Sequence, residues 1–191
     1  KYKYVSKELK NDVKFMARVV DCNWRALCYA SNEFRNNIEL MTRAVKCNWR
    51  ALQYASDELK CHNVLVMIAV KQSWKALEHA NADVCNEIML VAVKQNWEAL
   101  YCAYNYYDDE GAVPQLCSDK DIVLAAVRQN VFALNFATDK MKRDPAIIIS
   151  CIHGGDMTFA NDEQKANKRL VKIAVGKNGR ALVDASEELK K

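Results

Sequence analysis

A tryptophan-centred motif that recurs about every 25 residues most constrains what this chain can fold into. Four tryptophans mark it at intervals of 25, 25 and 23 residues, at Trp24, Trp49, Trp74 and Trp97. The segments 23–31 and 48–56 are nearly identical and read Asn-Trp-Arg-Ala-Leu-x-Tyr-Ala-Ser. Copies without tryptophan follow at Val131, in the degenerate segment 144–163 and at Gly179, and half a unit opens the chain at 4–10. A fixed period of this length, here in about seven and a half units, is the signature of a repeat array.

Hydrophobic spacing within one unit predicts two short helices. Ile38, Met41 and Val45 fall on one face at helical spacing. Asn48 then interrupts the pattern, and asparagine caps a following helix because its side chain accepts from free amides of the first turn. A second helix is expected over about 49–60. Helices of roughly ten residues are marginal alone, so we expect neighbouring units to bury their stripes. The sequence therefore predicts an all-α solenoid of two-helix repeats, one continuous array over residues 1–191.

The recurring W-x-A-L-x-Y-A-S-x-E-L-K pattern, clearest at Trp24 and Trp49, resembles the repeat family known as domain of unknown function 4116. The resemblance covers nearly the whole chain and is weak over 144–163. It implies helical repeats. It implies no activity, and it supplies no catalytic residues.

The spacing breaks once, where an insertion of about nine residues lengthens the interval between Trp97 and Val131 to 34 residues. The segment 104–118 is aromatic and acidic at its start, and its Gly and Pro predict an irregular loop. Insertions in repeat arrays often lie on a binding face. A tolerated surface loop and a partner-contact loop both remain open, the second using Tyr106, Tyr107, Asp108 and Asp109.

Basic residues recur at two fixed positions. Three residues before the tryptophan position stand Lys46, Lys71, Lys94 and Arg128, and one residue after it stand Arg25, Arg50, Lys75 and Arg180. Acidic residues stand nine after it, at Glu33, Glu58, Asp83 and Glu188. The first basic column is explained by cations that offset a helix C-terminal dipole. The second has no such explanation, so a basic edge that binds an acidic or phosphate-rich ligand stays open beside a structural role.

Catalytic and metal-binding patterns are weak. Cys151 and His153 are two residues apart in the degenerate unit, and such positions do not face each other on a helix. Cys61, His62, His79 and Cys85 match no zinc spacing, and no nucleotide-binding or hydrolase motif occurs. We expect no metal, no cofactor and no enzyme activity, and no small-molecule substrate is evident. The first hypothesis is a scaffold for protein–protein interaction, including as a subunit of a larger assembly. A phosphate binder along the basic edge is the alternative, and a cysteine enzyme at Cys151 and His153 is the third.

Composition narrows the setting. A net charge of +4 over 191 residues, without an arginine-rich motif, does not favour nucleic acid as partner. No apolar run is long enough to span a membrane. Eight cysteines without a C-x-x-C pair suggest reduced, mostly buried thiols, and hence a reducing compartment such as the cytosol or an organelle matrix. Neither terminus carries a polar capping unit, so we expect a segment of a longer array or ends that dock on other chains.

The expected core follows from the same repeat. The tryptophan position and the leucine three residues later are predicted to be buried in each unit, at Trp24, Trp49, Trp74 and Trp97 and at Leu27, Leu52, Leu77, Leu100, Leu134 and Leu182. The units without tryptophan are all C-terminal, and we expect that half to pack less tightly or to cover its face with a partner. For a fully buried Trp49, substitution by alanine is expected to cost about 3–5 kcal/mol.

Overall fold

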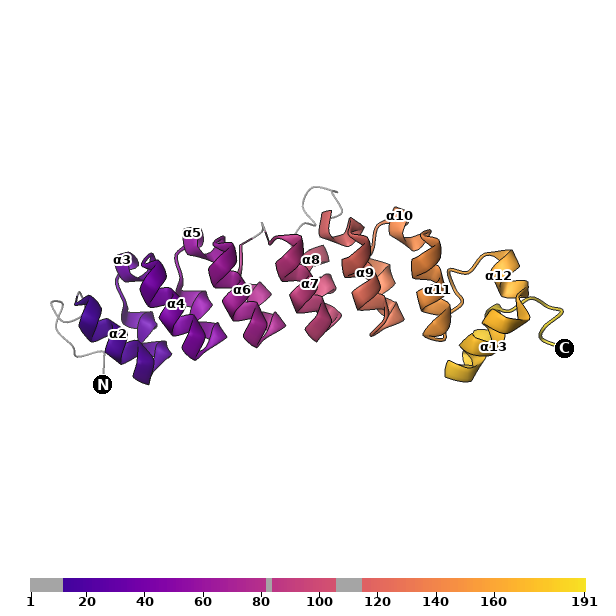
Figure 1. Cartoon of the computed structure of the whole chain (residues 1–191), viewed down its shortest axis with the longest axis horizontal. Helices are drawn as coiled ribbons and strands as arrows, with labels where there is room; N and C mark the ends of the chain where they lie inside the picture. Colours follow the sequence, from indigo (N-terminus) through magenta and orange to yellow (C-terminus); the bar gives the residue numbers. More distant parts are fainter. Residues whose placement is uncertain (1–11, 82–83, 106–114) are drawn as a thin grey trace. The chain divides into compact units, whose positions relative to one another are not determined.

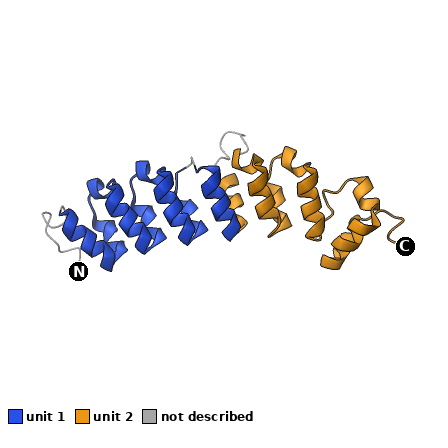
Figure 2. Cartoon of the chain, in the orientation of Figure 1, with its two compact units in different colours: residues 1–95 blue, residues 96–191 orange. Residues whose placement is uncertain are grey.

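The computed structural model describes residues 12–81, 84–105 and 115–191 (Figure 1). Within these ranges the regular structure is helical throughout and contains no strand, which confirms the predicted all-α repeat fold. Two compact units make up the chain, residues 1–95 and 96–191 (Figure 2). A single continuous array over residues 1–191 stays a prediction.

The first unit repeats a ten-residue α-helix followed by a six-residue 3₁₀ helix. Its elements are α2 (Val13–Cys22), η2 (Trp24–Tyr29), α3 (Asn32–Arg35), α4 (Ile38–Cys47), η3 (Trp49–Tyr54), α5 (Asp57–Lys60), α6 (Asn63–Gln72), η4 (Trp74–His79) and α7 (Asn86–Gln95). The long helices pack as neighbours in the order α2, α4, α6 and α7, and η2, η3 and η4 form a second layer in the same order.

The second unit keeps this plan with more variation. Its elements are α8 (Glu98–Asn105), η5 (Gln115–Ser118), α9 (Lys120–Val127), η6 (Val131–Phe136), α10 (Asp139–Lys142), α11 (Pro145–His153), α12 (Asp162–Ala166), α13 (Lys168–Lys177) and η7 (Gly179–Asp184). The helices α9, α11 and α13 pack in sequence, and η6 packs against α8. The predicted insertion residues Tyr106, Tyr107, Asp108 and Asp109 lie outside the described residues.

The predicted continuous helix over 49–60 is wrong, because the chain leaves the helical path at Ala55 and Ser56. Both residues are extended, with ψ of 153° and 160°. The Ser56 N–H donates to the Arg35 carbonyl of the preceding repeat at 3.0 Å. The Ser56 hydroxyl accepts from the Leu59 N–H and so caps α5. A serine that bonds locally competes with helix continuation, and the same backbone bond recurs from Asn81 to Lys60, Thr138 to Cys117 and Ser186 to Lys165.

Side-chain amides bond to free backbone groups at junctions between a long helix and its 3₁₀ helix. Asn48 caps η3 by accepting from the Arg50 N–H, as its position predicted. Gln72, from the next repeat, accepts from the Trp49 N–H at 3.0 Å and donates to the Val45 carbonyl at 2.6 Å. Gln95 makes the same two bonds to Trp74 and Val70. Each glutamine therefore links two repeats through backbone groups that helix ends leave unpaired.

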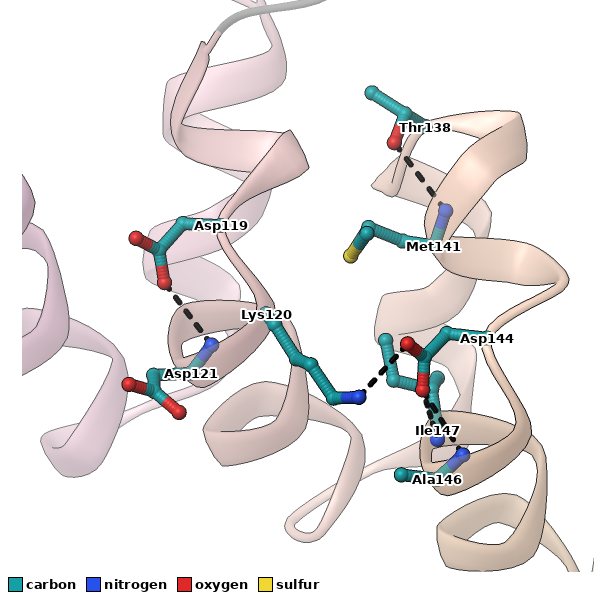
Figure 3. Close-up of polar contacts among 8 residues, drawn as sticks. All are labelled: Asp119, Lys120, Asp121, Thr138, Met141, Asp144, Ala146 and Ile147. Atoms are coloured by element: carbon teal, nitrogen blue, oxygen red, sulfur yellow. Dashed lines mark hydrogen bonds and ion pairs between the residues drawn. The ribbon is translucent and has the colours of Figure 1, made fainter.

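Charged caps also join repeats, as Figure 3 shows for α9 and α11. Asp144 caps α11 by accepting from the Ala146 and Ile147 N–H groups, and its other oxygen lies 2.8 Å from Lys120 Nζ. The hydrogen bond from Lys120 lowers the pKa of Asp144 below its usual value. In the first unit, Arg43 forms a bidentate pair with Asp21 across adjacent repeats. Such exposed pairs fix the alignment of repeats more than they stabilise the fold.

The core consists of leucine, alanine and valine rather than indole rings. Leu27, Leu52, Leu77, Leu100 and Leu134 are buried, and so are the alanines beside them. All four tryptophans are only partly buried, so their placement in the core is wrong. The prediction is also wrong for Leu182, which is 39% exposed in η7.

The burial of Leu52 and the partial exposure of Trp49 predict that alanine lowers the free energy of unfolding more at Leu52 than at Trp49. Leu52 is fully buried, so Leu52→Ala is expected to lower the free energy of unfolding by about 3 kcal/mol. Trp49 keeps part of its ring in solvent, so Trp49→Ala is expected to cost about 2 kcal/mol rather than the larger loss of a core ring. Urea unfolding followed by circular dichroism measures both, and a larger loss for Trp49→Ala would contradict the assignment of the core.

Candidate functional site

The basic residues of both predicted columns are exposed. Those of the second column that directly follow a tryptophan also contact the indole beside them. Lys46, Lys71 and Lys94 lie in the last turns of α4, α6 and α7, where cations offset the helix dipole. In the second column Arg25 and Arg50 lie over the indoles that precede them, at 4.6 and 4.5 Å, and Lys75 lies 5.9 Å from Trp74. These cation–π contacts supply the structural reason that the sequence did not reveal.

Two of these indoles also contact a ring of the next repeat. Trp24 packs against Tyr54, and Trp49 stacks on His79 with centroids 5.9 Å apart. Burial lowers the pKa of His79 below its usual value, and nearby Lys60 and Arg50 lower it further while Glu78 opposes them. In the second unit Trp97 stacks on Phe136 at 6.5 Å. In these three pairs the ring five residues after one tryptophan position packs on the preceding tryptophan, whereas the position five residues after Trp97 is occupied by Cys102.

Five aromatic residues of the second unit gather into one exposed surface, here named the aromatic cluster, which consists of Trp97, Tyr101, Tyr104, Phe132 and Phe136. Phe136 lies at its centre and touches the other four rings at centroid distances of 5.1 to 6.5 Å. Phe132 is 58% exposed, Tyr101 46% and Tyr104 37%. Exposed aromatic side chains held rigid by each other are the type of residue that dominates binding at protein interfaces.

The sequence did not reveal this cluster, because its members lie in two repeats and flank the insertion. Tyr101 and Tyr104 follow Trp97 in α8, and Phe132 and Phe136 belong to η6. Their positions four and seven residues after Trp97, and one and five after Val131, place them on facing elements. This spacing of aromatic residues was the one sequence pattern that could have predicted the cluster.

The repeat of segment 144–163, the sixth when the Trp24 repeat is counted as the first, is shorter than an intact repeat. Its Asp156 occupies the capping position, since the Asp156 carboxylate accepts from the Thr158 N–H as the Asn48 side chain accepts from the Arg50 N–H. The next cap, Asn161, stands five positions after Asp156. In an intact repeat, Ser56 stands eight positions after Asn48. The three missing residues correspond to the tryptophan, the basic residue and the alanine of an intact repeat.

Two glycines form the turn that makes this shortening feasible. Gly155 has φ of +91°, which side-chain-bearing residues rarely adopt. A Cβ there would stand 2.9 Å from Asn178 Cβ. A Cβ on Gly154 would stand 2.8 Å from a Val131 methyl group. The glycines therefore let the end of α11 approach both neighbouring repeats closely.

An open groove of about 640 Å³ lies at the shortened repeat. Val131 and Phe132 line it from the fifth repeat, and Gly154, Gly155 and Phe159 from the sixth. Arg128 is the lining cation, and the amides of Asn130, Asn135 and Asn178 also face the groove. Phe132 belongs to both the groove and the aromatic cluster, so the two form one continuous surface.

Cys151 and His153 do not form a nucleophile and base pair. Cys151 is 1% exposed in the core, whereas His153 is exposed at the end of α11. Burial, together with the Asp156 carboxylate, raises the pKa of Cys151 to about 12, which suppresses the thiolate that nucleophilic attack requires. Among the residues that the structure describes, no group of three His, Cys, Asp or Glu side chains is placed to hold a metal ion.

The expectation of mostly buried cysteines is wrong. Cys117 and Cys151 are buried and Cys85 and Cys102 partly so, but Cys22, Cys28, Cys47 and Cys61 are exposed. Cys22 and Cys47 hold the position that Gln72 and Gln95 hold in later repeats, next to the junction rather than in the core. None of these eight cysteines, all of which lie in the described part of the chain, forms a disulfide bond.

Comparison with known proteins agrees with the repeat architecture. The family described as Domain of unknown function (DUF4116) matches residues 1–35, 12–60, 37–84 and 86–142. The chain is a helical-repeat protein, and it belongs to this family. No curated protein and no solved structure matches it. Over the described residues, none of the helices is both long and apolar enough to cross a membrane.

The burial pattern predicts an order of thiol reactivity. Iodoacetamide at about pH 8 should alkylate Cys22, Cys28, Cys47 and Cys61 first, because the reagent can reach these exposed side chains. Cys117 and Cys151, whose pKa values are raised by burial to about 11 and about 12, should react last. Peptide mass spectrometry at short reaction times measures the order, and labelling of Cys151 as fast as Cys61 would contradict its placement.

The two-glycine turn predicts opposite effects for two glycine substitutions. Gly155→Ala should destabilise the fold by about 1–3 kcal/mol, because alanine is strained at positive φ and meets Asn178. Gly176 lies in α13 with open space around its Cα, so Gly176→Ala should stabilise by up to about 1 kcal/mol. Urea unfolding of the two variants tests the turn, and equal stabilities would show that it is not built as described.

Proposed function

We propose that this protein is a non-catalytic helical-repeat scaffold that binds another protein through the aromatic cluster of its second unit. The carrying observation is the exposure of Phe132, Tyr101 and Tyr104 around a common ring, Phe136. Apolar patches of this kind on a folded surface mark interaction sites. Pre-packed rings lose little conformational entropy when a partner covers them, which favours binding.

The repeat architecture supports a binding role over a catalytic one. Stacked repeats expose long surfaces while each repeat contacts only its neighbours, which suits assembly with other chains, including as a subunit of a complex. The separation of buried Cys151 from exposed His153 removes the best catalytic pair that the sequence offered. Four exposed free thiols favour a reducing compartment, the cytosol or an organelle matrix, because an oxidising one would drive them into disulfides.

A second candidate function is binding of a phosphate-rich ligand along one edge of the first unit. Six cations are exposed there and take no part in the ion pairs described for this unit: Arg25, Lys46, Arg50, Lys71, Lys75 and Lys94. A cation that lies on an indole face keeps its charge available to solvent. Binding of this kind weakens steeply as salt rises, since each phosphate contact releases counterions.

Crosslinking capture tests the scaffold hypothesis. The whole chain, immobilised by a terminal tag, is incubated with a cell lysate and crosslinked, and mass spectrometry locates the linked residues. We expect a protein partner linked near the aromatic cluster, resistant to about 0.3 M salt, and recovered at least ten-fold less on Tyr101→Ser with Tyr104→Ser.

Tyr29→Ser is the matched control, because Tyr29 is a similarly exposed ring in the first unit and forms none of the described ring contacts. Equal losses with the control, or no protein linked to the second unit, would contradict the scaffold hypothesis. Recovery only of polyanions that elute with salt would favour the basic edge.

A further inference from the structure

The groove lies where intact repeats place an indole. Trp24, Trp49 and Trp97 each pack on the ring that stands five residues after the next tryptophan position: Tyr54, His79 and Phe136. In the fifth repeat the tryptophan is replaced by Val131, which lines the groove. Phe159 immediately precedes Ala160, whose N–H donates to the Met157 carbonyl as the Ala55 N–H after Tyr54 donates to the Leu52 carbonyl, so Phe159 is the equivalent ring of the sixth repeat.

The ring on which an indole would pack, Phe159, is present, but Val131 stands where intact repeats have the indole. Phe159 packs on the core of the second unit and also faces the groove. A valine side chain is far smaller than an indole, and the sixth repeat beside it is shorter by three residues than an intact repeat. Because the volume of about 640 Å³ exceeds one indole, the groove can hold an aromatic side chain together with its neighbours.

The polar rim indicates what would accompany that side chain. Arg128 is exposed, and the described ion pairs do not include it. The anion of the groove, Asp156, is engaged with the Thr158 N–H. An arginine fork suits a carboxylate. The side-chain oxygens of Asn130 and Asn178 already cap η6 and η7, which leaves their NH₂ groups to donate to a peptide carbonyl, while the Asn135 amide can both donate and accept.

We propose that the groove binds a peptide segment of a partner protein whose aromatic side chain takes the place of the missing indole on Phe159, with a neighbouring Asp or Glu on Arg128. This specifies the partner of the scaffold proposed above and rests on that function. The groove adjoins the aromatic cluster through Phe132, so a bound segment can extend onto the cluster.

A randomised nonapeptide library displayed on phage, selected against the whole chain, provides the test. Selected peptides should share one aromatic residue beside an acidic one. Their affinity, measured by fluorescence anisotropy, should fall at least ten-fold on Val131→Trp, which restores the chain's own indole. Arg128→Glu, a surface change, should cost at least ten-fold and shift the selected preference from acidic to basic neighbours.

Two controls separate this proposal from the broader one. Lys94→Glu changes the equivalent repeat position in the first unit and should leave affinity unchanged. The pair Tyr101→Ser and Tyr104→Ser should weaken capture of a partner protein but change peptide affinity less than Arg128→Glu does. Failure to select any peptide, or selected peptides that bind Val131→Trp and Arg128→Glu as well as the unaltered chain, would overturn the groove proposal. The scaffold proposal would still stand if capture depended on the aromatic cluster.

Discussion

The structure depends on one constraint: helices of ten residues cannot hold their shape without a neighbour to cover their apolar faces. In the first unit α4 buries Leu40, Met41, Ala44 and Val45, and all of these positions face adjacent elements. The described core contains no buried polar or charged residue. Stability therefore accrues repeat by repeat through interfaces, as expected of a quasi-one-dimensional array.

Backbone groups at the helix ends decide the form that this packing takes. A glutamine from the following repeat bonds to Trp49 and Val45, and a backbone bond ties Ser56 to the preceding repeat. These bonds draw the chain out of a continuous helix and leave a 3₁₀ segment and a short α-helical turn. Trp24 and Trp49 then lie at the rim between a cation and the ring of the next repeat, which explains their regular spacing without full burial.

The features encoded in local periodicity could be predicted from the sequence. The features set by contacts between repeats could not. The repeat, the cap at Asn48 and the buried Leu52 follow from spacing and side-chain chemistry. The break at Ser56 depends on a bond to Arg35, 21 residues earlier. The register of the sixth repeat could not be read because Asp156 substitutes for a capping asparagine, and only its hydrogen bond to Thr158 identifies it. The aromatic cluster required knowing that α8 packs against η6.

The proposed functions use the two places where the array departs from its regular repeat, the exposed rings beside the insertion and the groove of the shortened repeat.

Hydrogen exchange at single-residue resolution tests most directly whether bonds between repeats hold the fold together. The Trp49, Trp74 and Ser56 amides, which bond to groups of other repeats, should exchange as slowly as amides inside α4. Exchange of these amides at the rate of an unstructured peptide, while α4 stays protected, would contradict a fold held together between repeats.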